Sequence, residues 1–218
     1  MNYLNIKYNY NDKPLSEYPE KFVNFNIDKF HLKNKKLLEI GCGRGDFTNC
    51  FKRQGVDIIA IDHNEDPKKY LDKGIKFTVC NINNEKIYLE DNSIDAIYSK
   101  SVLEHIANPD NFFKETARVL KPGGILITYT PDWESQYKHF YDDTTHIRPY
   151  TILSLNQAHM SYGFKKCKVI KFYQLPITWK FPTIKFLCKI ISLFVPIRSK
   201  IKFFRFSKEL MLLSIATK

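Results

Sequence analysis

Three glycines and two carboxylates at a strand-to-helix junction form the strongest chemical signal in this sequence. Gly41, Gly43 and Gly45 lie in the run LLEIGCGRGDF, with Glu39 two residues before the first glycine and Asp62 seventeen residues after the last. Glycine lets the backbone approach a ligand without a Cβ clash, and the N–H groups that begin the following helix face that ligand. An acid at the end of the next strand can accept the hydroxyls of a ribose. This order predicts a site for a nucleoside-type cofactor.

The glycine spacing separates two classes of nucleoside cofactor. A dinucleotide fingerprint is G-x-G-x-x-G, and its pyrophosphate lies at the helix N-terminus. Here the spacing is G-x-G-x-G. The carboxylate of Glu39 would repel a pyrophosphate, whereas it suits a cofactor that carries an amino group and a sulfonium. The pattern therefore disfavours a nicotinamide cofactor and favours a cofactor that carries positive charge.

A second polar cluster follows a later predicted strand. Residues 130–151, TPDWESQYKHFYDDTTHIRPYT, combine two histidines, four acids, an arginine and five aromatic residues. His146, with Asp143 to orient it, is the pair whose chemistry fits a general base; the alternative is a histidine that ties the loop to the sheet. Arg148 can hold a phosphate or carboxylate in bidentate fashion, or pair with a neighbouring aspartate. Tyr141 is a further candidate for acceptor binding, with loop packing as its alternative.

These residues need a scaffold whose strands end at one edge. From residue 36 onward, short apolar runs alternate with helical segments, which is typical of a parallel sheet with crossover helices. The sequence predicts strands at 36–40, 57–61, 75–79, 94–98, 125–129, 169–173 and 210–216, and helices at 46–54, 67–73, 110–120 and 151–162. A KPGG turn at 121–124 is expected to reverse the chain into the fifth strand.

Four motifs in this order resemble those of the class I S-adenosylmethionine-dependent methyltransferases. They are LEIGCGRG, the strand-end Asp62, IDAIYSKSVLEHI at 94–106 and VLKPGG at 119–124, and they cover residues 35–131. The resemblance implies a Rossmann-like, doubly wound α/β fold with a seven-stranded sheet whose last strand is antiparallel. It also implies S-adenosyl-L-methionine as the cofactor, S-adenosyl-L-homocysteine as its product, and no metal.

The resemblance assigns the cofactor contacts to single positions. The methionine end would meet Glu39, Gly41 and the backbone carbonyl of Ser99, and the ribose would meet Asp62. The other contacts come from the glycine loop, the residue after Asp62 and the end of the third strand: Cys42, Gly43, Gly45, His63, Asn81 and Ile82. Many relatives have Asp at the position of Asn81, but its amide oxygen can still accept from the adenine amine. His105, in the Glu-His pair after the fourth strand, is expected to line the cofactor and substrate pocket rather than to act as the base.

The run Asp143–Thr151 resembles a subgroup of these methyltransferases associated with bacterial capsule and lipopolysaccharide genes, which show D-x-T-H-x-R-P-[FY]-T. The leading functional hypothesis is therefore O-methylation of a sugar, or of a phosphate- or phosphoramidate-bearing precursor, in the biosynthesis of a surface polysaccharide. A membrane-associated quinone or lipid methyltransferase is the first alternative. Nucleic-acid binding is the alternative of another class, although the fourth strand lacks the N/D-P-P-Y sequence of enzymes that methylate base amines.

The net charge of +11 is concentrated in one part of the chain. Residues 144–208 contain 13 Lys and Arg and no Asp or Glu. Within them, residues 176–206 form a basic amphipathic insertion with apolar residues at helical spacing: Ile184, Leu187, Ile191 and Phe194. The insertion predicts an anionic partner, either a small-molecule or lipid-linked acceptor or a membrane surface contacted peripherally. A lysine-rich composition with no partner is the alternative.

The length of 218 residues suits a single methyltransferase domain. Its expected parts are an N-terminal helical lid (1–30), the cofactor-binding core (35–131), a substrate-side segment (132–175), the basic insertion (176–206) and the last strand (207–218). Five cysteines without a C-x-x-C pair argue against disulfides or a zinc site. No signal peptide or membrane-spanning run is visible. We therefore expect a cytoplasmic protein, with the inner face of the membrane as a further location.

Overall fold

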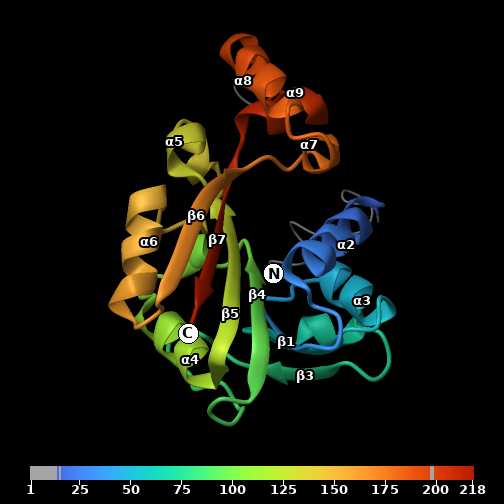
Figure 1. Cartoon of the computed structure of the whole chain (residues 1–218), viewed down its shortest axis with the longest axis vertical. Helices are drawn as coiled ribbons and strands as arrows, with labels where there is room; N and C mark the ends of the chain where they lie inside the picture. The colour runs from blue at the N-terminus through green and yellow to red at the C-terminus, as the bar shows by residue number, and fades with distance from the viewer. Residues whose placement is uncertain (1–13, 15, 197–198) are drawn as a thin grey trace.

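Seven strands, the number that the resemblance implies, form one sheet in the order β3-β2-β1-β4-β5-β7-β6 (Figure 1). Strands β1 to β5 pair in parallel, whereas β7 is antiparallel to β5 and β6. The computed structural model describes residues 14, 16–196 and 199–218. The strands are β1 Lys36–Ile40, β2 Asp57–Asp62, β3 Lys76–Val79, β4 Ile94–Lys100, β5 Leu120–Pro131, β6 Lys166–Phe172 and β7 Met211–Thr217.

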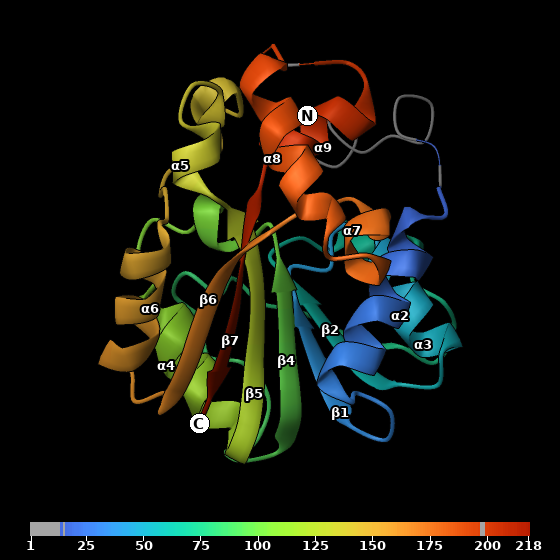
Figure 2. The same ribbon diagram turned by 45° about the horizontal axis from the view of Figure 1, so that its top comes forward.

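Helices cover both faces of this sheet (Figure 2). They are α2 Tyr18–Phe30, α3 Asp46–Arg53, α4 Asp110–Val119, α5 Trp133–Gln136, α6 Ile152–Ser161, α7 Pro176–Lys180, α8 Ile184–Phe194 and α9 Lys202–Lys208, with short 3-10 helices η1 Asp66–Lys69, η2 Leu103–His105 and η3 Phe140–Asp142. Successive side chains of a strand point to opposite faces. Leu37 therefore packs with Phe22 and Phe51 of α2 and α3, and Leu38 joins Phe112 of α4 on the other face.

The predicted N-terminal lid is described only in its second half, since residues 1–13 and 15 lie outside the described residues. There, α2 lies on one face of the sheet. Phe22 and Val23 are fully buried, and the Tyr129 hydroxyl donates to Asn26 Oδ1 at 2.9 Å. This half of the segment is part of the core rather than a cover over the carboxyl edge of the strands.

The helix predicted at 67–73 is wrong in extent, because only the single 3-10 turn η1 forms there. The side-chain amide of Asn49 donates to the Tyr70 carbonyl at 2.8 Å and accepts from the Asp72 N–H at 2.9 Å. These bonds engage backbone groups that a longer helix would use. The KPGG segment also differs from the predicted turn, since β5 includes it as an irregular stretch between the pairs Ile94↔Leu120 and Ala96↔Ile125.

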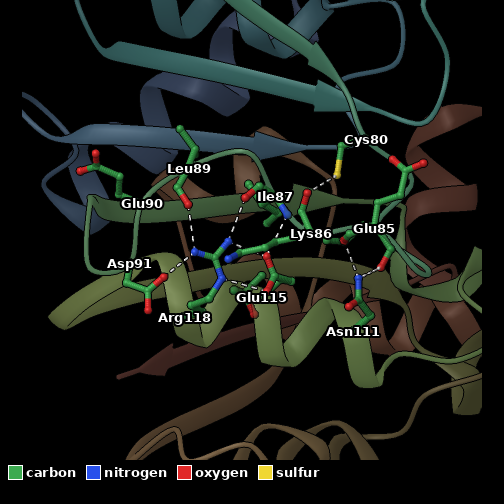
Figure 3. A network of polar contacts seen from close by, with 12 residues as sticks. Cys80, Glu85, Lys86, Ile87, Leu89, Glu90, Asp91, Asn111, Glu115 and Arg118 are labelled. Carbon is green, nitrogen blue, oxygen red and sulfur yellow. Dashed lines mark hydrogen bonds and ion pairs between the residues drawn. The ribbon is translucent and has the colours of Figure 1, made fainter.

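A network of hydrogen bonds and ion pairs around Arg118 of α4 holds the segment that follows β3 (Figure 3). The guanidinium of Arg118 donates to the carbonyls of Ile87 and Leu89 and is paired with Glu115 at 2.6 Å. Asn111, the second residue of the same helix, donates to the carbonyl of Ile82 at 3.0 Å. Helix α4 thereby holds the 80–91 loop, whose first residues border the site described below.

The insertion leaves and rejoins the sheet at one edge. Phe172, the last residue of β6, pairs with Met211, the first residue of β7, which lies opposite Pro131 at the carboxyl end of β5. Helices α7, α8 and α9 therefore stand beyond the carboxyl edge of the parallel strands (Figure 1). No helix in the described part of the chain has the length and apolar character needed to cross a membrane.

Candidate active site

A cavity of about 570 Å³ opens at the carboxyl ends of β1, β2 and β4. The chain order reverses between β1 and β4, and in open α/β sheets the crevice at such a point binds the ligand. Its walls come from the glycine loop 41–44, from the residues that follow β2 and β3, and from two acceptor-side segments, 100–106 and 144–147.

Glycine is favoured at positions 41 and 43 of the loop for different structural reasons. Gly41 has φ +77°, and a Cβ there would lie 2.3 Å from Val102 Cγ2. Gly43 also has a positive φ, +52°, but a Cβ there would meet nothing within 4 Å, because the residue borders the cavity. Gly41 thus allows close packing of the loop on Val102, just before η2, whereas Gly43 leaves room for a ligand.

Asp62 stabilises the loop and presents a carboxylate to the cavity. Its Oδ2 accepts from the Gly43 N–H at 2.9 Å and its Oδ1 from the Asn64 N–H at 3.1 Å, with His63 Nδ1 at 3.1 Å. Burial alone would raise the pKa of Asp62, but these hydrogen bonds and the His63 ring lower it below its usual value. The hydrogen bond with Asp62 in turn raises the pKa of His63. Asp62 is therefore an ionised acceptor at neutral pH.

Glu39 is the second acid of the cavity, and its environment is the opposite. The side chain is only 3% exposed, and its Oε2 accepts from Thr48 Oγ1 at 2.6 Å. Burial raises the pKa of Glu39 to about 8, with a smaller contribution from Asp62. A cationic group placed beside Glu39 would restore the ionised form, so this position suits the ammonium and sulfonium of S-adenosylmethionine.

Most of the predicted cofactor residues gather around this cavity. Those that line it are Glu39, Gly41, Cys42, Gly43, Asp62, His63, Asn81, Ile82 and the pocket candidate His105. Gly45 and Ser99 do not line it. Gly45, at the start of α3, packs toward Leu71. Ser99 pairs with Ile40 within the sheet, and its hydroxyl is buried without a hydrogen-bond partner among the described residues.

The acceptor side is built by hydrogen bonds between η2 and the 144–148 loop. The Glu104 carbonyl accepts from the N–H groups of Ile147 and Arg148 at 2.8 and 3.1 Å. The Nδ1 atom of His105 lies 3.0 Å from the Thr145 carbonyl. A carbonyl only accepts, so Nδ1 carries the proton and Nε2 is the nitrogen of the neutral ring that can take one.

His146 lies beside His105, with 4.8 Å between ring centroids. The group that orients His146 differs from the prediction. Its Nδ1 donates to the Phe140 carbonyl at 2.7 Å, whereas Asp143 Oδ2 lies 3.9 Å from Nε2 and Asp143 Oδ1 accepts from Thr145 Oγ1 at 2.6 Å. The backbone carbonyl of Phe140, rather than the Asp143 carboxylate, therefore holds the ring of His146. His146 itself is not among the lining residues; His105 is.

Glu104 completes a trio with the two histidines. Its carboxylate is buried and accepts from Thr130 Oγ1 at 3.0 Å. Burial raises the pKa of Glu104 to about 7. One potential ligand atom from each of Glu104, His105 and His146 lies within 4.8 Å of the other two, so the trio offers a donor set for a divalent cation.

The two remaining predicted substrate residues lie on the outer part of this loop. Arg148 donates to the Ala107 carbonyl at 2.7 Å, so its contact in the structure is with backbone rather than with a neighbouring aspartate. Tyr141 is 56% exposed and packs edge-on against Trp133 and Phe140. Neither residue lines the cavity.

Sequence reasoning missed several residues of the cavity wall. Arg44, between two loop glycines, is 8% exposed and makes paired hydrogen bonds to Asp46. Lys100 lies at the end of β4 with its Nζ 5.4 Å from the centre of the Phe47 ring. The other missed residues are Ile40, Asp46, Phe47, Asn64, Cys80, Asn83, Ser101, Val102, Ile106, Thr144, Thr145 and Ile147. The only signal for them in the sequence is adjacency to predicted residues.

Comparison with known proteins agrees with this geometry. Residues 38–128 match the family described as Methyltransferase domain. The structure superposes on a SAM-dependent methyltransferase from Archaeoglobus fulgidus with a TM-score of 0.65, at 20% identity, over 91% of this chain and 94% of that one. Residues 38–128 are therefore similar to a methyltransferase domain, and the sheet as a whole has the fold of a SAM-dependent methyltransferase.

Two relatives with known names match part of this chain. The chain is 32% identical over 109 residues to the mitochondrial ubiquinone biosynthesis O-methyltransferase of Rattus norvegicus, a match that covers 45% of this chain and 31% of that protein. It is 28% identical over 124 residues to the ubiquinone biosynthesis O-methyltransferase of Pseudomonas fluorescens, covering 54% and 53%. The chain thus spans about a third to a half of the length of these relatives. They are quinone enzymes rather than the surface-polysaccharide enzymes that the 143–151 run indicated.

Proposed function

We propose that this chain transfers a methyl group from S-adenosylmethionine to a hydroxyl of an amphipathic aromatic acceptor of the quinone-precursor type. The observation that carries the proposal is the pairing, in one cavity, of the acid-lined glycine loop with a histidine and apolar wall on the other side. The similarity to ubiquinone biosynthesis O-methyltransferases supports the acceptor class.

Residues on the cofactor side would hold the cation and the ribose. S-adenosylmethionine, when bound, supplies a methyl group on a sulfonium, which is already a good leaving group. Glu39 would ionise next to the methionine ammonium, Asp62 would accept from the ribose, and Asn81 with Ile82 would border the adenine. The chain's own contribution is to align the reacting atoms and to exclude water.

On the acceptor side, His105 would take the proton of the attacking hydroxyl at Nε2. The Thr145 carbonyl fixes the ring through Nδ1, and His146 packs against it as a positioning residue. A base in this place typically accelerates transfer by about 10²–10⁴-fold. The sequence prediction gave the role of base to His146, and single substitutions of the two histidines distinguish the two assignments.

The apolar part of the wall bears on the class of acceptor. Ile106 and Ile147 flank His105 in the cavity, and such side chains pack against the faces of an aromatic ring. A phenolic hydroxyl titrates near pH 10, as tyrosine does, so an imidazole can take its proton far more readily than that of a sugar hydroxyl. A sugar would leave its other hydroxyls against apolar side chains, which is costly.

Acceptor profiling tests the proposal. The full chain would be incubated with S-adenosylmethionine and either a catechol bearing a short polyprenyl tail, a catechol without the tail, or a nucleotide sugar, and products would be weighed by mass spectrometry. We expect the tailed catechol to gain one methyl group, and His105→Ala to lose this activity. Methylation of the nucleotide sugar alone would contradict the proposal and would support the sequence-based hypothesis of surface-polysaccharide biosynthesis.

A further inference from the structure

Helix α8 has apolar residues on two sides, of which one packs on the protein and the other faces solvent. Cys188 is fully buried against the protein, with Ile184 and Ile191 half-buried beside it. The opposite side forms an exposed stripe at positions one helical turn apart: Phe186, Leu187, Ile190, Leu193 and Phe194. Phe186, Leu193 and Phe194 are 72%, 76% and 82% exposed. The face predicted from spacing is therefore only partly covered, since Ile184 and Ile191 are half-buried whereas Leu187 and Phe194 are exposed.

The stripe continues onto α9 and is bordered by cations. Ile201 and Phe204 are 59% and 39% exposed, and α9 packs against α8. Residues 176–208 contain eight Lys and Arg and no acid. Lys189 borders the stripe on α8, and Lys200 and Lys202 flank Ile201; all three are exposed. A large apolar patch with a cationic rim on a folded surface marks an interaction site.

One anchor holds this surface at the carboxyl edge of the sheet. Trp179 of α7 stacks on Phe172 and donates from Nε1 to the Tyr173 carbonyl at 2.8 Å. Within the surface, Lys208 donates to the Val195 carbonyl at 2.8 Å and so joins the end of α9 to the end of α8. The insertion therefore lies on the side of the molecule to which the parallel strands, and so the cofactor cavity, are open (Figure 2).

We infer that α8 and α9 form a docking surface for an anionic phospholipid bilayer. The apolar stripe would enter the interface between headgroups and acyl chains, and the lysines beside it would extend to the lipid phosphates. Helix α8 has 11 residues, or about 16 Å, against about 30 Å for the hydrocarbon core. It can lie in the interface but not span it.

The charge distribution selects this partner over a second copy of the chain. A twofold interface brings one patch against itself, so the lysines around the stripe would face the same lysines without an acid in the segment to offset them. An anionic bilayer instead offers negative charge at the rim and hydrocarbon at the centre. This matches both parts of the surface.

Vesicle sedimentation with the full chain tests the inference. The triple variant Phe186→Ser, Leu193→Ser, Phe194→Ser removes the stripe, and Lys189→Gln, Lys200→Gln, Lys202→Gln removes the rim. With vesicles of equal parts phosphatidylcholine and phosphatidylglycerol we expect the wild type to pellet and the stripe variant to bind at least tenfold more weakly. Each lysine removed should weaken binding about fivefold, the equivalent of about 1 kcal/mol. High salt should weaken wild-type binding, because it screens the charges.

Matched controls separate this surface from general stickiness. Tyr88, Leu153 and Met160 are also exposed apolar residues, and Lys165, Lys166 and Lys168 are exposed lysines at the opposite edge of the sheet. Serine or glutamine at these positions should leave vesicle binding unchanged. Calorimetric binding of S-adenosylhomocysteine, which should be equal in all variants, verifies that they fold. Equal pelleting of the stripe variant and the wild type would overturn the inference. The inference would also be overturned if the wild type formed a dimer and did not bind vesicles, while the stripe variant was a monomer.

Discussion

The two sides of the active-site cavity differ in what forms them. On the cofactor side, a glycine turn, its backbone N–H groups and two strand-end acids make most of the wall and lie within residues 39–64, with residues 80–83 completing it. On the acceptor side the wall joins η2 to the 144–147 loop, segments about forty residues apart, through Glu104 and His105. The first side depends on local backbone conformation, and the second depends on tertiary hydrogen bonds. Substitutions on the two sides should therefore have separable effects on cofactor affinity and on turnover.

The largest expected effect is on the acceptor side. His105→Ala should lower turnover by about 10²–10⁴-fold, because the hydroxyl loses its proton acceptor, while affinity for S-adenosylhomocysteine stays within a few-fold. His146→Ala should cost less, since it removes only the ring packed against His105. Single-turnover rates and calorimetry measure the two quantities. His31→Asn, at an exposed left-handed position with φ 52°, is the control. If His146→Ala has the larger effect on turnover, the base is His146.

The next largest effect is on the cofactor side. Asp62→Asn should weaken binding of S-adenosylmethionine at least tenfold, because hydrogen bonds to a charged group contribute about 1.5–3 kcal/mol each. Turnover at saturating cofactor should change little. Calorimetry would compare this variant with Asp57→Asn, an exposed acid at the other end of β2. NAD should bind neither protein, and tight NAD binding would contradict the cofactor assignment.

A smaller effect links Glu39 to pH. Because the pKa of Glu39 is raised to about 8, the folded apo protein keeps a proton that the unfolded chain releases near pH 4.5. This contribution to stability is complete below pH 4.5 and is lost as pH rises through 8. Glu39→Gln should therefore raise the free energy of unfolding at pH 9 by about 1–3 kcal/mol, as measured by urea titration.

The same carboxyl should make cofactor binding depend on pH. A bound cation favours the ionised form, so affinity should rise by up to tenfold per pH unit from pH 6 to 8 in the wild type and be weaker and flat in Glu39→Gln. Glu90→Gln, an exposed acid, should behave as wild type. A pH-independent wild-type affinity would show that the cation does not meet Glu39.

The smallest expected effect concerns metal. We expect treatment with EDTA to leave turnover unchanged, because a sulfonium leaving group needs no Lewis acid and the histidine supplies the base. The trio of Glu104, His105 and His146 makes this a strict test. Loss of turnover with EDTA, restored by magnesium, manganese or zinc, would show that turnover requires a metal ion, and the trio would then be its site rather than the source of the base.

The sequence by itself predicted the strands and the residues of the cofactor side, and the resemblance implied a seven-stranded sheet; the strand order came from the structure. The sequence predictions rest on short-range rules: apolar runs form buried strands, glycine most readily accepts the φ values near +77° and +52° at positions 41 and 43, and an acid that ends a strand lies at the carboxyl edge. The one helix it placed wrongly, at 67–73, was ended by Asn49, whose hydrogen bonds join residues more than twenty positions apart.

Only the tertiary structure decided which histidine faces the cavity and which side of α8 faces solvent. The sequence predicts His146 as the base and His105 as a lining residue, and which ring borders the cavity depends on the Phe140 and Thr145 carbonyls that hold the two rings. Eight of the eleven residues of α8 are apolar, so periodicity could not say which of them the protein would bury. In both cases the outcome depends on partners distant in the chain, because packing and hydrogen bonding between separate segments fix a side chain's direction, and local propensity does not.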